Sequence, residues 1–260
     1  MNPQGIYTLV SRGNVLDRKM TAIANNLANV NTVGFKEDQP VFQQLFATVN
    51  GVAQESDEEM FAHHEHLAPY TGVGNFYVSV ADMGKNFKLG RLSHTGNNLD
   101  FAIASKEGFF SVSTPQGERY TRAGNFRLNT EGQLITAEGF QVNGKDGKPL
   151  TITGNKVELL EDGTILVDSK QIGGLRLVSF PFNERLQKLG GSLFAPVDAD
   201  NPPRVLEDVK MVQGMVEESN VDTVREMVRM IEANRSYTST QKALRVSDEM
   251  NEKAVSLARV

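Results

Sequence analysis

The chain has 260 residues, which is enough for one large domain or two modest ones with a real hydrophobic core. Charged residues make up 23% of the chain and its net charge is -5, so the composition gives no electrostatic reason to expect nucleic acid as a partner. No apolar run approaches the roughly 20 residues needed to cross a bilayer, and we expect a soluble chain. The absence of cysteine excludes disulfides and thiolate metal sites.

Residues 1–36 are predicted to form a long helix with a heptad seam. The seam positions recur at spacings of three and four: Ile6, Leu9, Gly13, Leu16, Met20, Ile23, Leu27 and Val30. Such spacing is typical of a helix that packs against partner helices. Asn25, Asn26, Asn29 and Asn31 crowd the end of this helix, and Gly34 makes its continuation unfavourable. The first 18 residues also lack the features of a general secretory signal.

Residues 37–80 are predicted to be a linker or extended loop region. Its middle is acidic near residues 54–59 and rich in small residues near 68–75. The sequence His63-His64-Glu65-His66 contains metal-ligand residue types, but zinc needs three or four converging ligands and nothing nearby completes a set. We therefore interpret this cluster as a solvated loop and predict no metal site.

Residues 81–212 are predicted to form an antiparallel β domain, either a sandwich or an irregular barrel. Short apolar segments are separated by turn dipeptides such as Glu131-Gly132, Glu138-Gly139 and Asp162-Gly163. The expected strands are 101–104, 109–113, 119–122, 126–128, 133–136, 140–142, 150–153, 157–160, 164–167 and 175–180. A loop is expected from 183 to 204, because this segment carries glycine and proline pairs.

Residues 213–260 are predicted to contain a second long helix. No proline or glycine follows Asn220, and Ser219 to Asp222 match an N-terminal capping pattern. An apolar stripe runs along it through Val224, Met227, Val228, Ile231, Tyr237, Leu244, Val246, Met250 and Leu257. The predicted fold class is thus mainly β with long N- and C-terminal α-helices: an antiparallel β domain plus a terminal-helix coiled coil.

Candidate catalytic groups are weak. Glu158, Glu161 and Asp162 supply carboxylates, but the sequence places them at a turn and on a sheet surface rather than in a cleft that would raise a pKa. The Gly72-Val-Gly-Asn segment lacks the strand and helix that a phosphate loop requires. We predict no catalytic, cofactor-binding or metal residues, and a protein that is not an enzyme.

Four sequence blocks resemble the signatures of flagellar basal-body rod and hook proteins. Residues 24–36 read Ala-Asn-Asn-Leu-Ala-Asn-Val-Asn-Thr-Val-Gly-Phe-Lys, a long and specific string. The other blocks are 98–103 with 108–110, 120–129 with 132–136, and 214–222. The resemblance covers nearly the whole chain and is weakest over 47–90 and 183–205. Within the family the likeness is greatest to proximal rod subunits, with distal rod subunits next.

The resemblance implies a structural subunit of the periplasmic basal-body rod, the drive shaft that transmits torque. It implies partners that are copies of this chain, other flagellar rod proteins and the flagellar type III export apparatus, with no nucleic acid, membrane insertion or cofactor. The resemblance also implies that the two terminal helices pair as a coiled coil. We therefore expect the assembly interface to contain Ile6, Leu9, Leu16, Met20, Ile23, Asn25, Asn26, Leu27, Asn29, Val30, Gly34, Phe35, Val224, Met227, Ile231, Tyr237, Leu244, Met250 and Leu257.

Three alternatives remain open from the sequence. The first is a distal rod or hook-related axial subunit. The second is a secreted β-domain adhesin or carbohydrate-binding protein, although the chain has no tryptophan and only five tyrosines. The third is a periplasmic hydrolase acting on peptidoglycan. Fold alone does not separate these functions.

Overall fold

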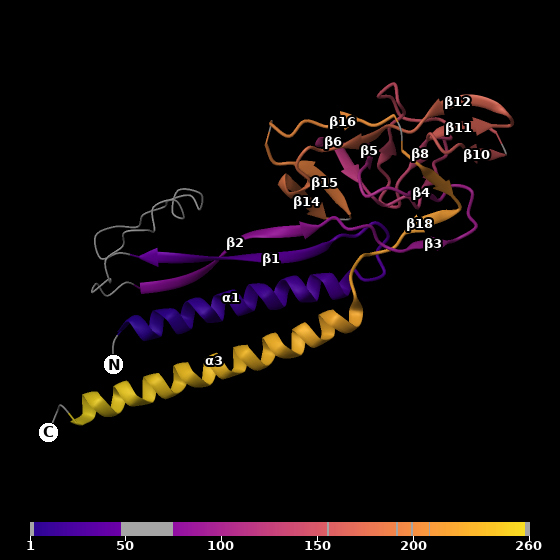
Figure 1. Cartoon of the computed structure of the whole chain (residues 1–260). Helices are drawn as coiled ribbons and strands as arrows, with labels where there is room; N and C mark the ends of the chain where they lie inside the picture. Colours follow the sequence, from indigo (N-terminus) through magenta and orange to yellow (C-terminus); the bar gives the residue numbers. More distant parts are fainter. Residues whose placement is uncertain are drawn as a thin grey trace. The chain divides into compact units, whose positions relative to one another are not determined.

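The computed structural model describes residues 3–47, 75–154, 156–190, 192–198, 200–207 and 209–257 (Figure 1). The chain divides into two compact units. Unit 1 takes in the described parts of Met1–Ala24, Gln39–Gly84 and Val224–Val260. Unit 2 is built from Asn25–Asp38 and Lys85–Thr223. Each unit is therefore assembled from segments that lie far apart in the sequence.

Unit 1 contains both predicted terminal helices. Helix α1 spans Pro3–Ala28 and helix α3 spans Thr223–Leu257, and Figure 1 shows them running alongside each other in opposite directions. Proline at the start of α1 is tolerated because the first turn of a helix has no partner for that backbone N–H group. No helix in the described part of the chain has the length and apolar character that a membrane crossing requires.

Two strands occupy the ends of the region that we expected to be a linker. Strand β1 (Glu37–Ala47) pairs with strand β2 (Asn75–Asn86) in a two-stranded sheet. The expectation of a linker over 37–80 is thus wrong at both ends of that range. The sequence signal was weak because β1 carries Pro40 and many polar residues, which are unusual in strands. The His63–His66 cluster lies outside the described residues.

Unit 2 is the antiparallel β domain, with its strands gathered into several small sheets. The largest has the order β14-β15-β6-β5-β9-β8-β7, with β13 pairing to β5 and to β16. A three-stranded sheet has the order β10-β11-β12, and two further pairs are β17-β4 and β18-β3. The bounds are β3 (Leu92–His94), β4 (Phe101–Ile103), β5 (Phe109–Thr114), β6 (Gly117–Thr121), β7 (Arg127–Leu128), β8 (Leu134–Ile135), β9 (Gln141–Val142), β10 (Val157–Leu159), β11 (Thr164–Val167), β12 (Lys170–Gly174), β13 (Leu177–Ser179), β14 (Leu186–Gly190), β15 (Leu193–Pro196), β16 (Arg204–Val205), β17 (Met211–Gln213) and β18 (Met215–Glu217).

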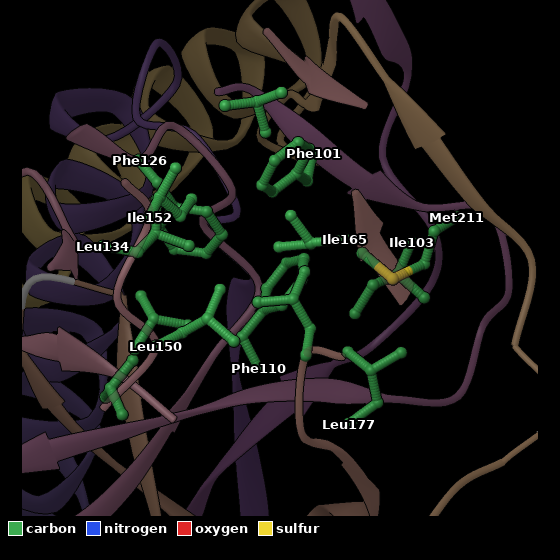
Figure 2. Close-up of a cluster of buried hydrophobic side chains, with 14 of the residues drawn as sticks. Phe101, Ile103, Phe110, Phe126, Leu134, Leu150, Ile152, Ile165, Leu177 and Met211 are labelled. Atoms are coloured by element: carbon green, nitrogen blue, oxygen red, sulfur yellow. The ribbon is translucent and has the colours of Figure 1, made fainter. Parts of the chain in front are cut away.

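The turn glycines close the hairpins as the sequence predicts. Gly132, Gly139 and Gly163 all have positive φ, the backbone region that favours glycine. Strand periodicity places alternate apolar side chains inward, and these form one core that includes Phe101, Phe110 and Ile165 (Figure 2). A second cluster is aromatic, with Phe109 in edge contact with Phe180 and Phe194.

Several boundaries differ from those that the sequence suggested. The segment 183–204 is not a loop throughout, because it contains a short 3-10 helix (Asn183–Arg185) followed by the β14–β15 hairpin. The strand expected at 150–153 is absent from the structure, in which Pro149 and Thr151 make isolated bridges. The last helix begins at Thr223, directly after the predicted capping residues 219–222, but strand β18 occupies Met215–Glu217 within the range assigned to the C-terminal helical domain. The boundary expected at 36 is also displaced, since residues 25–38 belong to unit 2.

Candidate assembly interface and the junction behind it

The predicted seam of α1 lies on a covered face of that helix. Ile23 is fully buried, and Leu9, Leu16, Met20 and Leu27 are partly buried. Ile6 lies in the helix, but its side chain is outside the described residues. The seam positions that can be followed are therefore all at least partly covered within the single chain.

The covered face of α3 is also a heptad pattern, but small and polar residues dominate it. Its fully buried positions recur every seven residues: Glu226, Ala233, Thr240 and Ser247. Four of its partly buried positions recur at the same interval: Met230, Tyr237, Leu244 and Asn251. Seven-residue spacing of this kind suits side-by-side helix packing, and small side chains allow a close approach. Two predicted interface residues, Tyr237 and Leu244, lie on this face.

The opposite face of α3 exposes an apolar stripe. Val224 is 72% exposed, Met227 49%, Val228 50% and Ile231 53%, and we call these four residues the outer stripe. Their spacing of three and four residues places them along one side of the helix. Met250, another predicted interface residue, is exposed further along the helix, whereas the side chain of Leu257 is outside the described residues. A continuous exposed apolar surface of this kind is typical of an interaction site.

The asparagines at the end of α1 form hydrogen bonds within the chain. Asn26 is buried and acts as a clamp: its side chain donates to the Asp38 carbonyl (2.9 Å) and accepts from the Asp38 N–H (2.8 Å). The Asn29 side chain donates to the exposed Asn25 carbonyl at 2.9 Å, and Thr32 donates to Asn29 at 3.2 Å. In the single chain these groups shape the turn after α1.

Gly34 and Phe35, also predicted as interface residues, are buried in unit 2. Gly34 has φ of +69°, and a Cβ atom there would lie 2.3 Å from the backbone nitrogen of Ala123. Its N–H donates to the Glu217 carbonyl at 2.7 Å. Only glycine fits at this point, because the two backbones approach closely. Val30, just before this turn, is partly buried.

Three buried charges meet behind this turn, and we call them the charge cluster: Lys36, Arg122 and Glu217. Their exposed fractions are 0%, 2% and 1%. One Glu217 oxygen lies 2.5 Å from the Lys36 amino group, and the other lies 3.4 Å from the Arg122 guanidinium. The Gly90 N–H also donates to Glu217 at 2.8 Å. One carboxylate thus serves two buried cations.

Backbone carbonyls supply the rest of the stabilisation in the charge cluster. Lys36 donates to the Lys88 carbonyl at 2.8 Å, and Arg122 donates to the carbonyls of Ser105 and Lys106. Burial lowers the pKa of the Lys36 amino group and of the Arg122 guanidinium, while the nearby Glu217 carboxylate opposes both shifts. The cluster is consequently sensitive to any loss of the single negative charge.

Strand β14 fastens the same segment from the other side. The Lys188 amino group donates to the Lys36 carbonyl (2.8 Å) and to the Asp38 carboxylate (3.0 Å). It also lies 3.6 Å from the centroid of the Phe35 ring, which is a cation–π contact. Burial lowers the pKa of Lys188, and Asp38 opposes the shift. Residues 35–38 are therefore held from both sides.

Asn220, which lies just before α3, completes this set of contacts. We call the set the junction, and it comprises residues 34–38, 86–90, 122, 188, 217 and 220. Its side-chain oxygen accepts from the Glu37 N–H at 2.8 Å. Its amide donates to the carbonyls of Asn86 at 2.7 Å and Lys88 at 3.0 Å. One side chain thus ties together three chain segments of unit 2.

Sequence reasoning did not assign a role to Lys36, Arg122, Glu217, Lys188 or Asn220. Charged residues usually lie on the surface, and nothing in their local spacing predicts that they meet. A signal was nevertheless present, because Lys36 ends the first signature block, Arg122 lies in the third, and the fourth contains both Glu217 and Asn220. The blocks that carry the resemblance are the ones that the fold brings together.

The geometry gives no support to a catalytic reading of the turn carboxylates. Asp162 accepts hydrogen bonds from the backbone and the hydroxyl of Thr164, at 3.0 and 2.8 Å. These bonds lower its pKa, whereas a general acid needs a raised one. Among the described residues, no three potential metal ligands of the His, Cys, Asp or Glu type gather at one point. The junction is built for holding chain segments together.

Three family models match successive parts of the chain. "Flagella basal body rod protein" matches residues 6–36, "Flagellar hook protein FlgE/F/G D1 domain" matches 103–167, and "Flagellar basal body rod FlgEFG protein C-terminal" matches 212–257. Each match contains one residue of the charge cluster: Lys36 lies in the first, Arg122 in the second and Glu217 in the third.

Relatives of known name match along nearly the whole chain. The flagellar basal-body rod protein FlgF of Mesorhizobium japonicum is 31% identical over 252 residues, covering 96% of this chain and 95% of its own. FlgG of Buchnera aphidicola subsp. Baizongia pistaciae is 33% identical, covering 90% and 92%. FlgG of Bacillus subtilis is 30% identical, covering 98% and 99%. With its terminal helices, its β domain and these matches, the chain belongs to the flagellar basal-body rod protein family.

Proposed function

We propose that this chain is a structural subunit of the flagellar basal-body rod and that it polymerises through its two terminal helices. The observation that carries this proposal is the outer stripe of α3, four apolar residues exposed along one helix whose opposite face is already covered. The relatives are named as rod proteins, which places the family among structural proteins and not enzymes.

Polymerisation into a shaft needs contacts that do not close on themselves. When one patch of a subunit meets a different patch on the next copy, the contact repeats as a helix and produces a filament. The outer stripe supplies one such patch. A second patch could include the exposed Asn25 and Asn31, which lie in the last turn of α1 and just after it. Long helical seams of this kind resist torque because many weak contacts act together.

A coiled coil of the terminal helices is part of this proposal. The α1 seam and the seven-residue repeat on the covered face of α3 both have the spacing that such packing uses. The two helices also belong to the same compact unit. Each chain would then supply one pair of helices, α1 and α3, and the outer stripe of that pair would bind the helices of neighbouring copies.

The proposed location is the periplasmic rod of the basal body. The proposed partners are copies of this chain, other rod proteins and the flagellar type III export apparatus. We assign the chain to the proximal rod, on the resemblance of residues 5–7 and 172–178. Relatives named FlgF and FlgG have similar identities, 31% and 33%, so overall identity does not separate relatives of these two names. The alternative is a distal rod or hook-related subunit.

The outer stripe can be tested with a single charge. In cells that lack the gene, Val228→Asp is expected to fold but to give no complete rod, because a carboxylate cannot be buried in an apolar seam. Ala243→Asp is the matched control, since Ala243 is exposed on the same helix but lies off the stripe. The readouts are swimming and electron microscopy of isolated basal bodies. Complete rods and normal swimming with Val228→Asp would show that the outer stripe is not an assembly surface.

A further inference from the structure

Residues 211–220 pair with strands formed much earlier in the chain, and we call them the closing segment. Strand β17 pairs with β4, joining Met211 to Ile103, and β18 pairs with β3, joining Met215 to His94. Met211 is also part of the main core, next to Ile103 and Leu177 in Figure 2. The core of unit 2 is therefore incomplete until the chain has been made to this point.

Side chains of the closing segment also bridge separate parts of unit 2. The Gln213 amide donates to the carbonyls of Asn98 (2.7 Å) and Val157 (2.8 Å), and its oxygen accepts from the Leu159 N–H (3.1 Å). Asn220 ties the segment to Glu37 in the same way. Without these two side chains, several backbone groups at the junction would lose their hydrogen-bond partners.

Glu217 makes the closing segment electrostatically necessary. It is separated from Lys36 by 181 residues and from Arg122 by 95 residues. Before Glu217 arrives, burial of the junction would place two cations in a low-dielectric site with no carboxylate between them. Their other partners are backbone carbonyls and, for Arg122, the Phe109 ring, whose centroid lies 5.3 Å from the guanidinium carbon; none of these carries a full charge. Closure before residue 217 is thus strongly disfavoured.

We propose that the closing segment completes unit 2 last, with Glu217 as the charge that permits closure. A chain that is delivered from its N-terminus then keeps residues 25–38 open to solvent until residue 220 is available. Because the closing segment comes late in the sequence, folding of unit 2 would be delayed until this segment is delivered. The relevance to export rests on the proposed function, because a subunit that passes through a channel must remain unfolded until most of its length has entered.

The test is pulsed hydrogen exchange during refolding of the full-length chain, kept dilute so that it stays monomeric. In the wild type, amides of the β5–β6 hairpin are expected to become protected first, and those of residues 25–38 and 211–220 are expected to follow together in a later phase. Protection of 25–38 in an earlier phase would overturn the proposal, whether or not the variants below fold. Assembly plays no part in this measurement. A result that overturns the proposed order of folding would therefore leave the proposed function unaffected.

Three variants separate the charge of Glu217 from simple disruption. Glu217→Gln keeps the shape but leaves two buried cations, so exchange at residues 25–38 is expected to be on the order of 100-fold faster. Glu218→Gln is the matched control, because the Glu218 side chain is 43% exposed and pairs with exposed Arg91. Adding Lys36→Met to Glu217→Gln returns the cluster to one excess positive charge and is expected to restore much of the protection. Wild-type exchange in Glu217→Gln, or no recovery in the double variant, would contradict the role given to this charge.

Discussion

Gly34 shows how closely two backbones approach at the junction. It has a positive φ and no space for a side chain, since an added Cβ would lie 2.3 Å from the Ala123 nitrogen. Gly96 has a similar φ of +73°, but nothing lies within 4 Å of its Cβ position. The two glycines therefore share a backbone conformation and differ only in the space around them.

This pair gives a controlled prediction. Gly96→Ala is expected to lower the free energy of unfolding by about 1 kcal/mol, the usual cost of a left-handed conformation for alanine. Gly34→Ala is expected to cost at least about 3 kcal/mol, because a backbone clash is added to the same strain. Urea unfolding of both variants measures the difference. Equal costs would mean that the close approach at Gly34 can relax.

Tyr120 predicts a dependence on high pH. Burial raises the pKa of its hydroxyl from 10.0 to about 12, so between these values the unfolded chain has lost a proton that the folded chain retains. Stability contributed by this group is complete below pH 10 and is lost as the pH rises through 12. Tyr120→Phe should therefore flatten the fall of the free energy of unfolding between pH 10 and 11.5. Denaturant unfolding at several pH values checks this, and parallel curves for both proteins would refute it.

At the scale of single elements, α3 is the clearest case of a helix whose two faces have different tasks. The side that is covered carries Ala233, Thr240 and Ser247, while apolar residues such as Ile231 are exposed. Ordinary amphipathic helices show the reverse arrangement. The covered face therefore combines small buried side chains with the partly buried Met230, Tyr237 and Leu244, while the apolar residues of the outer stripe stay exposed for other contacts.

The covered face can be tested by adding volume. Ala233→Leu is expected to lower the thermal midpoint of helix loss, at a cost of about 1–3 kcal/mol, because a well-packed contact has no room for three more carbon atoms. Ala243→Leu places the same side chain at an exposed position of the same helix and is expected to be nearly neutral. Circular dichroism at 222 nm measures both. Identical melting curves would show that the covered face is loosely packed.

Elements with a strong local signal could be predicted from the sequence. The α1 seam follows from regular apolar spacing, and the hairpins follow from pairs such as Asp162-Gly163. The β14–β15 hairpin was missed because two pairs of residues, Gly190-Gly191 and Pro202-Pro203, indicated a loop. The fully buried positions of α3, such as Thr240 and Ser247, were missed because threonine and serine do not resemble a core.

The junction could not be predicted in this way. Its central pair, Lys36 and Glu217, is a long-range contact between two residue types that are usually solvated. Asn26, which the sequence predicts at the assembly interface, clamps Asp38 within the chain, and no local pattern pointed to that contact. Local periodicity carries no information about such pairs, so only the signature blocks pointed to them.

At the scale of the whole molecule, the two units differ in how much apolar surface they bury. Among the described side chains of unit 1, the fully buried apolar residues are Ala22, Ile23 and Ala233. Unit 2 contains the main core and the aromatic cluster. Since burial of apolar surface is the main source of stability, unit 1 should open more easily than unit 2.

Hydrogen exchange of the monomer is expected to show this difference. Backbone amides of α1 and α3 should exchange much faster than those of β5 and β11, because few buried contacts oppose their opening. In assembled rods the same helical amides should become protected, as neighbouring copies cover the outer stripe. Slow exchange of both helices in a verified monomer would show that unit 1 is stable without partners.

The contact between Glu37 and Asn86 has a consequence for how this protein can vary in length. The Asn86 amide donates to the Glu37 carboxylate at 2.9 Å, so the chain leaves unit 2 and returns to it at neighbouring points. Whatever is inserted between these points can grow or shrink without changing the ends to which it is attached. The segment between Glu37 and Asn86 can accordingly change in length during evolution while the rest of the subunit stays constant.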